Sequence, residues 1–313
     1  MPKKLKYRGR IAQTGIYFGK LVRMFVYQND WKVLPMAALI GGLVTFAVGT
    51  NMFVTQEGTM NGCFALTCVC VWNGCFNSIQ VICRERPIIK REHRSGAHIT
   101  SYIAAHMIYQ MLLCIAQTAI ILTICHFAGI KYPETGLISG SFIIDFGISM
   151  FLITYAADMM SLAISAVVKN TTAAMTVMPF ILMFQLIFSG GLIILTGPAE
   201  NVTNFTITKW GLNSLCALGD FNSQPMVSLW NTLWQVRPYE IGGLQPVKEF
   251  TDYIRKNNML DQFLQDSGAY GAKEAFASTM DNVIGCWMVL ILMIILFALS
   301  ATIILEFIDR DKR

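Results

Sequence analysis

The histidines and cysteines of this chain are the residues best suited to metal or nucleophilic chemistry, but their spacing forms no site. No histidine is followed by another three or four positions later, the spacing that places two imidazoles on one helix face. His98 and His106 are eight positions apart, and His93 lies among charged residues. Cys68 and Cys70 would project about 200° apart on a helix, so we interpret them as small packing residues. We therefore expect no metal site.

Known catalytic motifs are also missing from the sequence. The chain contains no H-E-x-x-H, no G-x-S-x-G and no EF-hand loop. It lacks the G-x-x-x-x-G-K-[ST] loop that cradles nucleotide phosphates, because Gly19-Lys20 is followed by leucine. We therefore expect no catalytic residue and no cofactor on this chain, and no nucleotide bound through a phosphate loop of its own.

The most informative charged segment is 84–94, RERPIIKREHR, which lies between two long apolar runs. The runs 62–83 and 102–127 contain no Asp, Glu, Lys or Arg. Each run is long enough to cross a bilayer as a helix. The segment carries five Lys and Arg residues, and short basic connections of this kind are enriched on the cytosolic side. We expect a charged element presented to a partner in the cytosol.

Six apolar runs would position this element. The chain is 54% hydrophobic and 14% charged, whereas soluble domains average about 25% charged residues. We predict six transmembrane helices, at about 33–52, 62–83, 101–127, 141–168, 172–195 and 283–305. With both termini inside, seventeen of the 24 Lys and Arg residues fall on the cytosolic side. The predicted fold class is therefore all-α integral membrane, N-in and C-in.

Three regions lie outside the predicted spans. Residues 1–32 are basic, and 11–27 read as an amphipathic helix at the cytosolic surface, which either contacts a partner or only anchors the chain. Residues 196–282 form a long outer loop with a candidate re-entrant part, in which Trp230 and Trp234 indicate a helix with an interfacial face. Residues 308–313 form a cytosolic tail. Because the basic residues flank apolar spans, we expect no nucleic-acid partner.

Two features of the predicted spans could have a role in transport. Asp158 lies deep in the fourth span, where a carboxylate is costly and should face protein or a cavity. It would contact a substrate or a proton, but an interhelical hydrogen bond is favoured. Ser189-Gly190-Gly191 permits a helix break in the fifth span. Leu192 and Ile193 would then form an outer constriction, or the helix simply ends there.

The charged segment resembles a signature of a known family. Glu85-Arg86 through Arg91-Glu92 to Gly96 is similar to the E-R-x-x-x-x-R-E-x-x-x-G pattern of type-2 ABC exporters, especially the G-subfamily. Further similar stretches are Ser101-Tyr102-Ile103-Ala104, Leu162 to Asn170 through Pro179, Gln185 to Gly191, and Thr208-Lys209-Trp210. The similarity covers most of residues 11–307, so that 33–307 would be a six-helix type-2 ABC transmembrane domain. The ATPase domain that G-subfamily members carry is absent from these 313 residues.

The resemblance implies that segment 84–98 couples the membrane helices to an ATPase domain. The residues implied to make this coupling are Glu85, Pro87, Ile88, Ile89, Arg91, Glu92 and His93. Pro87 would start a helix in its first turn, Ile88 and Ile89 would be buried, and Glu85, Arg91 and Glu92 would form ion pairs across subunits.

The resemblance also implies a homodimer or heterodimer with a substrate cleft lined by spans two and five. The residues expected to line this cleft are Asn73, Phe76, Asn77, Met183, Phe184 and Ile187, with Leu192 and Ile193 at its outer end. The lining suits a lipid-like or amphipathic substrate. The expected partners are an ABC ATPase subunit that binds ATP and Mg²⁺, a second copy or close relative of this chain, and membrane lipid. The expected location is the bacterial plasma membrane.

Two other functions remain open at the level of sequence. One is a membrane scaffold or sensor that transports nothing and binds a ligand through its outer loop. The other is a secondary transporter, which would need paired inward charges or inverted repeats, and only Asp158 hints at that.

Overall fold

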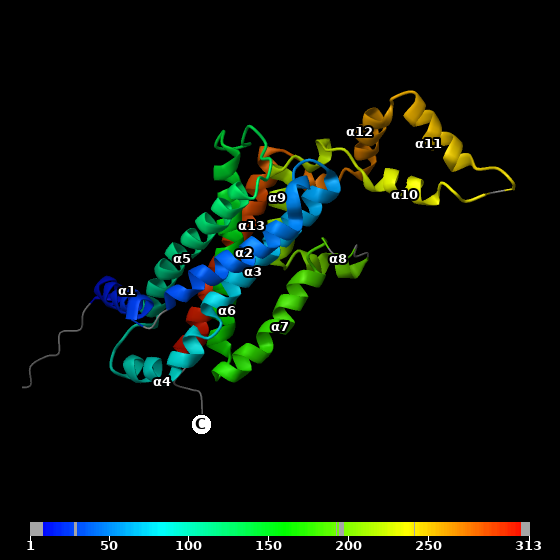
Figure 1. Cartoon of the computed structure of the whole chain (residues 1–313). Coiled ribbons are helices and arrows are strands. Elements are labelled where there is room, and N and C mark those ends of the chain that lie inside the picture. The colour runs from blue at the N-terminus through cyan, green and yellow to red at the C-terminus, as the bar shows by residue number, and fades with distance from the viewer. Residues whose placement is uncertain (1–8, 28–29, 192, 194–196, 241, 308–313) are drawn as a thin grey trace, which may run out of the picture.

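The chain folds into a bundle of helices in the computed structural model (Figure 1), which describes residues 9–27, 30–191, 193, 197–240 and 242–307. Every regular element within these ranges is helical. The bundle is built by α3 (Gln56–Ser78), α5 (Ile99–Phe127), α6 (Phe142–Val167) and α13 (Met280–Glu306). α6 lies at the centre, with most of its side chains buried. The basic tail at 1–8 and the tail at 308–313 lie outside the described residues.

The lengths of the apolar helices separate them into two groups. In the described part of the chain four helical stretches are long and apolar enough to cross a membrane, Gln56–Arg94, Ile99–Phe127, Phe142–Val167 and Met280–Glu306. The first of these combines α3 with α4 (Val81–Arg94). Two further helices are apolar but shorter, α2 (Val33–Val48) and α7 (Thr171–Ile187). The chain is therefore an all-helical integral membrane protein, and its six-span count stays a prediction.

A polar cluster lies between α3, α5 and α6 inside the bundle. Ser78 donates a hydrogen bond to one carboxylate oxygen of Asp158. Cys114 contacts the other at 3.5 Å, and Gln110 donates to the Ser78 hydroxyl at 2.9 Å. Asp158 is fully buried. This arrangement confirms the interpretation of Asp158 as an interhelical hydrogen-bonding residue, since a buried polar group needs such partners.

Helix α1 (Arg10–Tyr27) matches the amphipathic helix predicted for 11–27. Helix α4 begins earlier than predicted, at Val81, after a short turn at the end of α3. The Ser165 hydroxyl of α6 accepts the backbone N–H groups of Ile82 and Cys83 at 3.1 Å each, which fixes this helix start. Pro87 consequently lies inside the helix. The prediction that Pro87 starts the helix is wrong because the cap comes from a residue distant in sequence.

Helix α7 ends at Ile187, two residues before the serine and paired glycines where a break was predicted. Gly190 has a φ of 73°, a conformation that glycine adopts without the steric cost of a side chain. The helix therefore ends here, short of the predicted limit at 195, and among the described residues no helix resumes before Pro198. Leu192 lies outside the described residues, and Ile193 is 46% exposed. The outer constriction assigned to these two residues stays a prediction.

The segment after α7 returns into the bundle. Helix α8 (Pro198–Thr203) is short, and α9 (Ile207–Leu218) packs against α3, α6 and α13 with ten of its twelve residues buried. The side-chain oxygen of Gln185 on α7 accepts the backbone N–H groups of Ile207 at 2.9 Å and Thr208 at 3.3 Å. Gln185 is itself buried. It caps the start of α9, whose first N–H groups have no partner within the helix.

Replacing Gln185 with leucine is expected to lower the free energy of unfolding by about 2 kcal/mol, because two buried N–H groups lose their acceptor. Thermal unfolding of the purified chain in detergent measures the change. Gln235→Leu, at an exposed position of α10 (Ser228–Val236), is the control and should shift stability by less than about 0.5 kcal/mol. Equal stability of the two variants would show that α9 does not depend on this cap.

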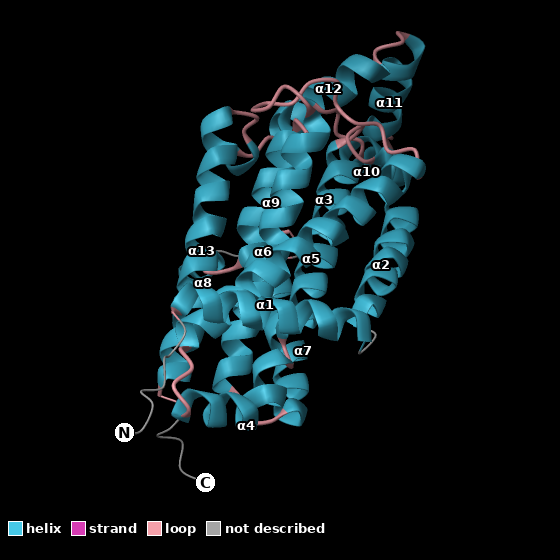
Figure 2. Cartoon of the chain, turned by 90° about the vertical axis from the view of Figure 1, so that its left-hand side faces the viewer, coloured by secondary structure: helices cyan, strands magenta, loops and turns pink. Residues whose placement is uncertain are grey.

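The outermost elements form a projecting arm. Helices α10, α11 (Pro246–Lys256) and α12 (Leu260–Gly271) extend beyond the bundle in Figure 1. Glu57 at the start of α3 holds the base of the arm, since its carboxylate accepts the N–H groups of Val227 and Ser228 at 3.1 and 2.6 Å. Trp230 and Trp234 lie on one helix, as predicted, with ring centroids 6.0 Å apart. Figures 1 and 2 place α4 and α1 toward the end of the molecule opposite the arm.

Candidate functional site

Helix α4 presents a continuous exposed face at the end of the bundle away from the arm. The exposed residues recur at helical spacing, as Arg84, Pro87, Ile88 and Arg91. Ile88 is 40% exposed in the middle of this face, between two arginines. An apolar side chain flanked by two cations is complementary to a surface that is apolar and acidic. We name these four residues the α4 face.

The opposite side of α4 is tied into the bundle by Glu85. The Glu85 carboxylate is 6% exposed, lies 3.1 Å from the ammonium group of Lys20 on α1, and accepts the Tyr102 hydroxyl of α5 at 3.2 Å. One carboxylate thus joins α4 to the next helix, α5, and to α1, which is distant in sequence. Because Glu85 has its partners within the chain, it does not reach the surface where an ion pair across subunits was expected.

Glu92 makes a second contact with α1, about two helical turns beyond Glu85 on α4. Its carboxylate accepts the Tyr17 hydroxyl at 2.9 Å, and the Tyr17 and Tyr102 rings meet edge to face with centroids 5.5 Å apart. Burial, assisted by the hydrogen bond to Glu92, raises the pKa of Tyr17, so the phenol stays protonated and can donate.

The residues implied to face an ATPase do not all lie on the exposed side of α4. Ile89 is buried against other residues of this chain. Of the residues implied to face an ATPase, Pro87, Ile88 and Arg91 therefore lie outward, whereas Glu85 and Ile89 are buried and Glu92 is engaged with α1.

Arg86 connects α4 to the central helix of the bundle. Its guanidinium donates to the backbone carbonyls of Ala166 at 2.9 Å and Val168 at 3.1 Å, at the end of α6. Those carbonyls have no partner within α6, so the arginine acts as a cap. His93 lies beside the end of α4, where its ring is 3.2 Å from the Ala97 carbonyl. Through Arg86 and Glu85, α4 is fastened to α1, α5 and α6.

The sequence did not predict which residues of this chain form the hydrogen bonds and ion pair that fix α4 to the bundle. Lys20 and Tyr17 were visible only as members of an amphipathic pattern, and no sequence signal pairs them with Glu85 and Glu92. Their pairing depends on how α1 crosses α5, which is a property of the fold. Tyr102 belongs to the stretch that carries the family resemblance, and the structure gives it a contact with Glu85.

The residues predicted to line a cleft fall into two groups. Phe76 on α3 and Met183 and Phe184 on α7 are exposed, and Ile187 is partly so. Asn77 instead faces α5 and exchanges two hydrogen bonds with the Gln117 amide, at 2.9 and 3.0 Å, while Asn73 is 4% exposed. The apolar members thus lie on the outside of α3 and α7, and their role in a cleft between two protomers stays a prediction.

Metal-ligating side chains form no second candidate site among the described residues. Among the described ranges no three His, Cys, Asp or Glu residues lie close enough together to hold a metal ion. The exposed features are instead the α4 face at one end and apolar helix surfaces along the sides. Exposed apolar surface along the sides of a helical bundle is typical of proteins that lie in a membrane.

Comparison with known proteins agrees with this arrangement. Residues 21–197 match the model of a family described as ABC-2 type transporter, in its membrane domain. The chain is also similar to an ABC transporter ATP-binding/permease protein of Mycobacterium tuberculosis, with 29% identity over 153 residues. That match covers 48% of this chain and 18% of the mycobacterial protein, so the chain spans a small part of that relative's length. With a family match across more than half of its residues, this chain belongs to the ABC-2 type transporter family.

Proposed function

We propose that the chain is the membrane-spanning permease subunit of an ABC exporter, with the α4 face as the surface on which a separate ATPase subunit docks. The observation that carries the proposal is that α4 has one exposed side and one side that is hydrogen-bonded to the rest of the bundle. One side is exposed as Arg84, Pro87, Ile88 and Arg91, and the other is bonded to three helices through Glu85 and Arg86. A force applied to the exposed side would therefore reach α1, α5 and α6 together.

The proposed topology places α4 in the cytosol, with α2 and α7 completing six spans. Both helices are short of the roughly 20 residues that a straight span needs. Local thinning of the bilayer or flanking residues that reach the interface accommodates such helices. On this topology the arm formed by α10 to α12 lies outside the cell, and the basic residues around α4 lie inside. The proposed location is the bacterial plasma membrane, in line with the mycobacterial relative.

The proposed substrate is lipid-like or amphipathic. Phe76, Met183 and Phe184 present apolar surface on α3 and α7, and two copies of the chain would face each other across these helices. Exposed side chains of this kind suit lipid tails or a second protomer rather than ions. ATP and Mg²⁺ would bind to the ATPase subunit, and this chain would supply no catalytic group.

The test is reconstitution of the chain with its candidate ATPase in lipid vesicles. The expected result is ATP hydrolysis that increases when a transported amphiphile is added, and export of that amphiphile that requires ATP. A chain that retains no ATPase on purification, and whose outer arm alone binds a ligand, would instead be a scaffold or sensor and would overturn the proposal.

A further inference from the structure

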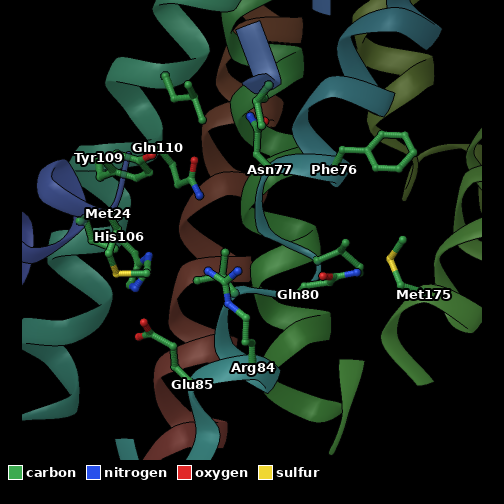
Figure 3. Close-up of a pocket in the computed structure, with 15 residues that line it drawn as sticks. Met24, Phe76, Asn77, Gln80, Arg84, Glu85, His106, Tyr109, Gln110 and Met175 are labelled. Carbon is green, nitrogen blue, oxygen red and sulfur yellow. The ribbon is translucent and has the colours of Figure 1, made fainter. Parts of the chain in front are cut away.

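A pocket lies within one protomer, between α1, the start of α2, the junction of α3 with α4, and α5. Its volume is about 240 Å³, and its walls include Met24, Phe76 and Leu113. Figure 3 shows His106 and Gln110 from α5, Arg84 and Glu85 from α4, and Asn77 from α3 arranged around the same space. All of its lining residues belong to one chain, and they include Phe76 and Asn77, which were also predicted to line the cleft between protomers.

Two polar side chains in this pocket carry buried atoms without a hydrogen-bond partner. His106 is 1% exposed, and neither of its ring nitrogens has a partner. Gln110 is equally buried, and its side-chain oxygen is unpartnered while its nitrogen donates to Ser78. A buried polar group without a partner costs about 1–3 kcal/mol. Such groups are retained where a ligand or water supplies the missing bonds.

The charges around the pocket favour an anion. Arg84 lies at the pocket wall with its side chain exposed. The carboxylate of Glu85 also lines the pocket, but it is already bonded to Lys20 and Tyr102. The guanidinium is therefore the charge left to meet a ligand, and a guanidinium binds carboxylate and phosphate oxygens well.

An apolar pocket adjoins the polar one. It measures about 320 Å³, lies between α2 and α3, and is lined by Met36, Ala37 and Ile40. Val33 and Phe76 belong to both pockets, so the two spaces share a wall. Its surface is almost entirely apolar, apart from Lys32 at one end and the amides of Asn73 and Gln117. A polar compartment beside an apolar one matches a molecule with one polar head and one hydrocarbon tail.

From these features we propose that each protomer binds an anionic amphiphile, with its carboxylate or phosphate head at Arg84 and His106 and its hydrocarbon tail along α2 and α3. Binding needs neither the ATPase nor a second protomer. If the reconstituted chain transported nothing, the proposed binding site would be unaffected by that result. If the purified chain bound no amphiphile in this pocket, the proposed transport function would be unaffected.

The experiment measures equilibrium binding of radiolabelled oleate to the purified chain in maltoside micelles. Arg84→Gln is expected to weaken binding about tenfold, which is the loss of one charge-assisted hydrogen bond. Arg23→Gln removes an exposed arginine from α1 that does not line the pocket, and it should bind oleate as the unchanged chain does. Equal binding by all three proteins, or equal loss in both variants, would overturn the proposal.

His106→Leu gives a second measurement that a purely structural role would not produce. Removing an unpartnered buried imidazole should raise the thermal unfolding temperature and weaken oleate binding at the same time. A variant that loses stability and binds oleate normally would contradict the site and would indicate a pocket filled by water alone.

An anionic head group on a hydrocarbon tail can belong to a free fatty acid or to an anionic phospholipid. Native mass spectrometry of the chain from nanodiscs of phosphatidylcholine, with and without phosphatidylglycerol, separates them. Retained phosphatidylglycerol that oleate displaces assigns the site to a phospholipid, and oleate binding without retained lipid assigns it to a single-chain amphiphile. Binding of neither would overturn the proposal.

Discussion

Ile88→Asp is expected to abolish co-purification of the ATPase subunit while leaving the permease folded. Ile88 is 40% exposed at the centre of the α4 face, so its substitution disturbs no core packing. Burying an isoleucine at an interface contributes about 2 kcal/mol, and burying an aspartate against an apolar and acidic partner surface costs about as much again. Together these effects weaken the complex by at least about a thousandfold. Affinity purification followed by measurement of bound ATPase checks the result.

The matched control is Val54→Asp, near the end of the bundle that carries the arm. Val54 is 39% exposed, close to the value for Ile88, and it lies two residues before α3, at the opposite end of that helix from α4. This variant should retain the ATPase at the level of the unchanged chain. If Ile88→Asp also retains it, the α4 face is not the docking surface and the proposed function loses its main support.

The sequence predicted those elements whose signal is local. The apolar runs, the amphipathic α1 and the glycine pair after α7 each depend on residues close together in the chain, and the structure has the corresponding helices and the end of α7 before the glycine pair. Asp158 was assigned to an interhelical bond because burial of a carboxylate leaves few alternatives. These predictions needed no knowledge of which helix lies beside which.

The sequence could not predict which side of α4 faces outward. A helix exposes every third or fourth residue, so its phase depends on where it starts and on what it packs against. Ser165, more than eighty positions away, sets the start, and Lys20 and Tyr102 select Glu85 for the inner side. Charge density alone suggested that the acidic residues would face a partner. The structure leaves mainly basic and apolar residues on the α4 face.

The sequence predicted the return of α9 into the bundle only as a candidate re-entrant part somewhere within 196–282, without its bounds or its contacts. Its twelve residues are too few for a span, and the sequence around them mixes apolar residues with threonine, lysine and tryptophan. What stabilises α9 in the bundle is the cap from Gln185 and the close approach of Gly211 to Ile153, where an added methyl group would meet that side chain at 2.8 Å. Both are contacts between segments distant in sequence, which periodicity does not report.

Gly74→Ala is expected to prevent accumulation of folded protein, because the added methyl group would meet backbone atoms of a second helix. Gly74 lies where α3 crosses α6, and a Cβ atom there would be 2.2 Å from the Thr154 carbonyl oxygen and 2.8 Å from the Asp158 backbone nitrogen. Both obstacles are backbone atoms, so neither can rotate away, and the two helices would have to separate. Overpacking of this kind costs about 3 kcal/mol or more.

Gly42→Ala on α2 is the control for this substitution, because an added Cβ there meets no atom within 4 Å. It should be neutral or stabilising by up to about 1 kcal/mol, since alanine is the better helix former. Size-exclusion chromatography of detergent-solubilised protein, with thermal unfolding of the recovered peak, compares the two variants. Equal recovery would mean that α3 and α6 tolerate separation. Asp158 would then have to keep its contacts with Ser78 and Cys114 by side-chain adjustment alone, and the bundle could not be the rigid body through which α4 acts.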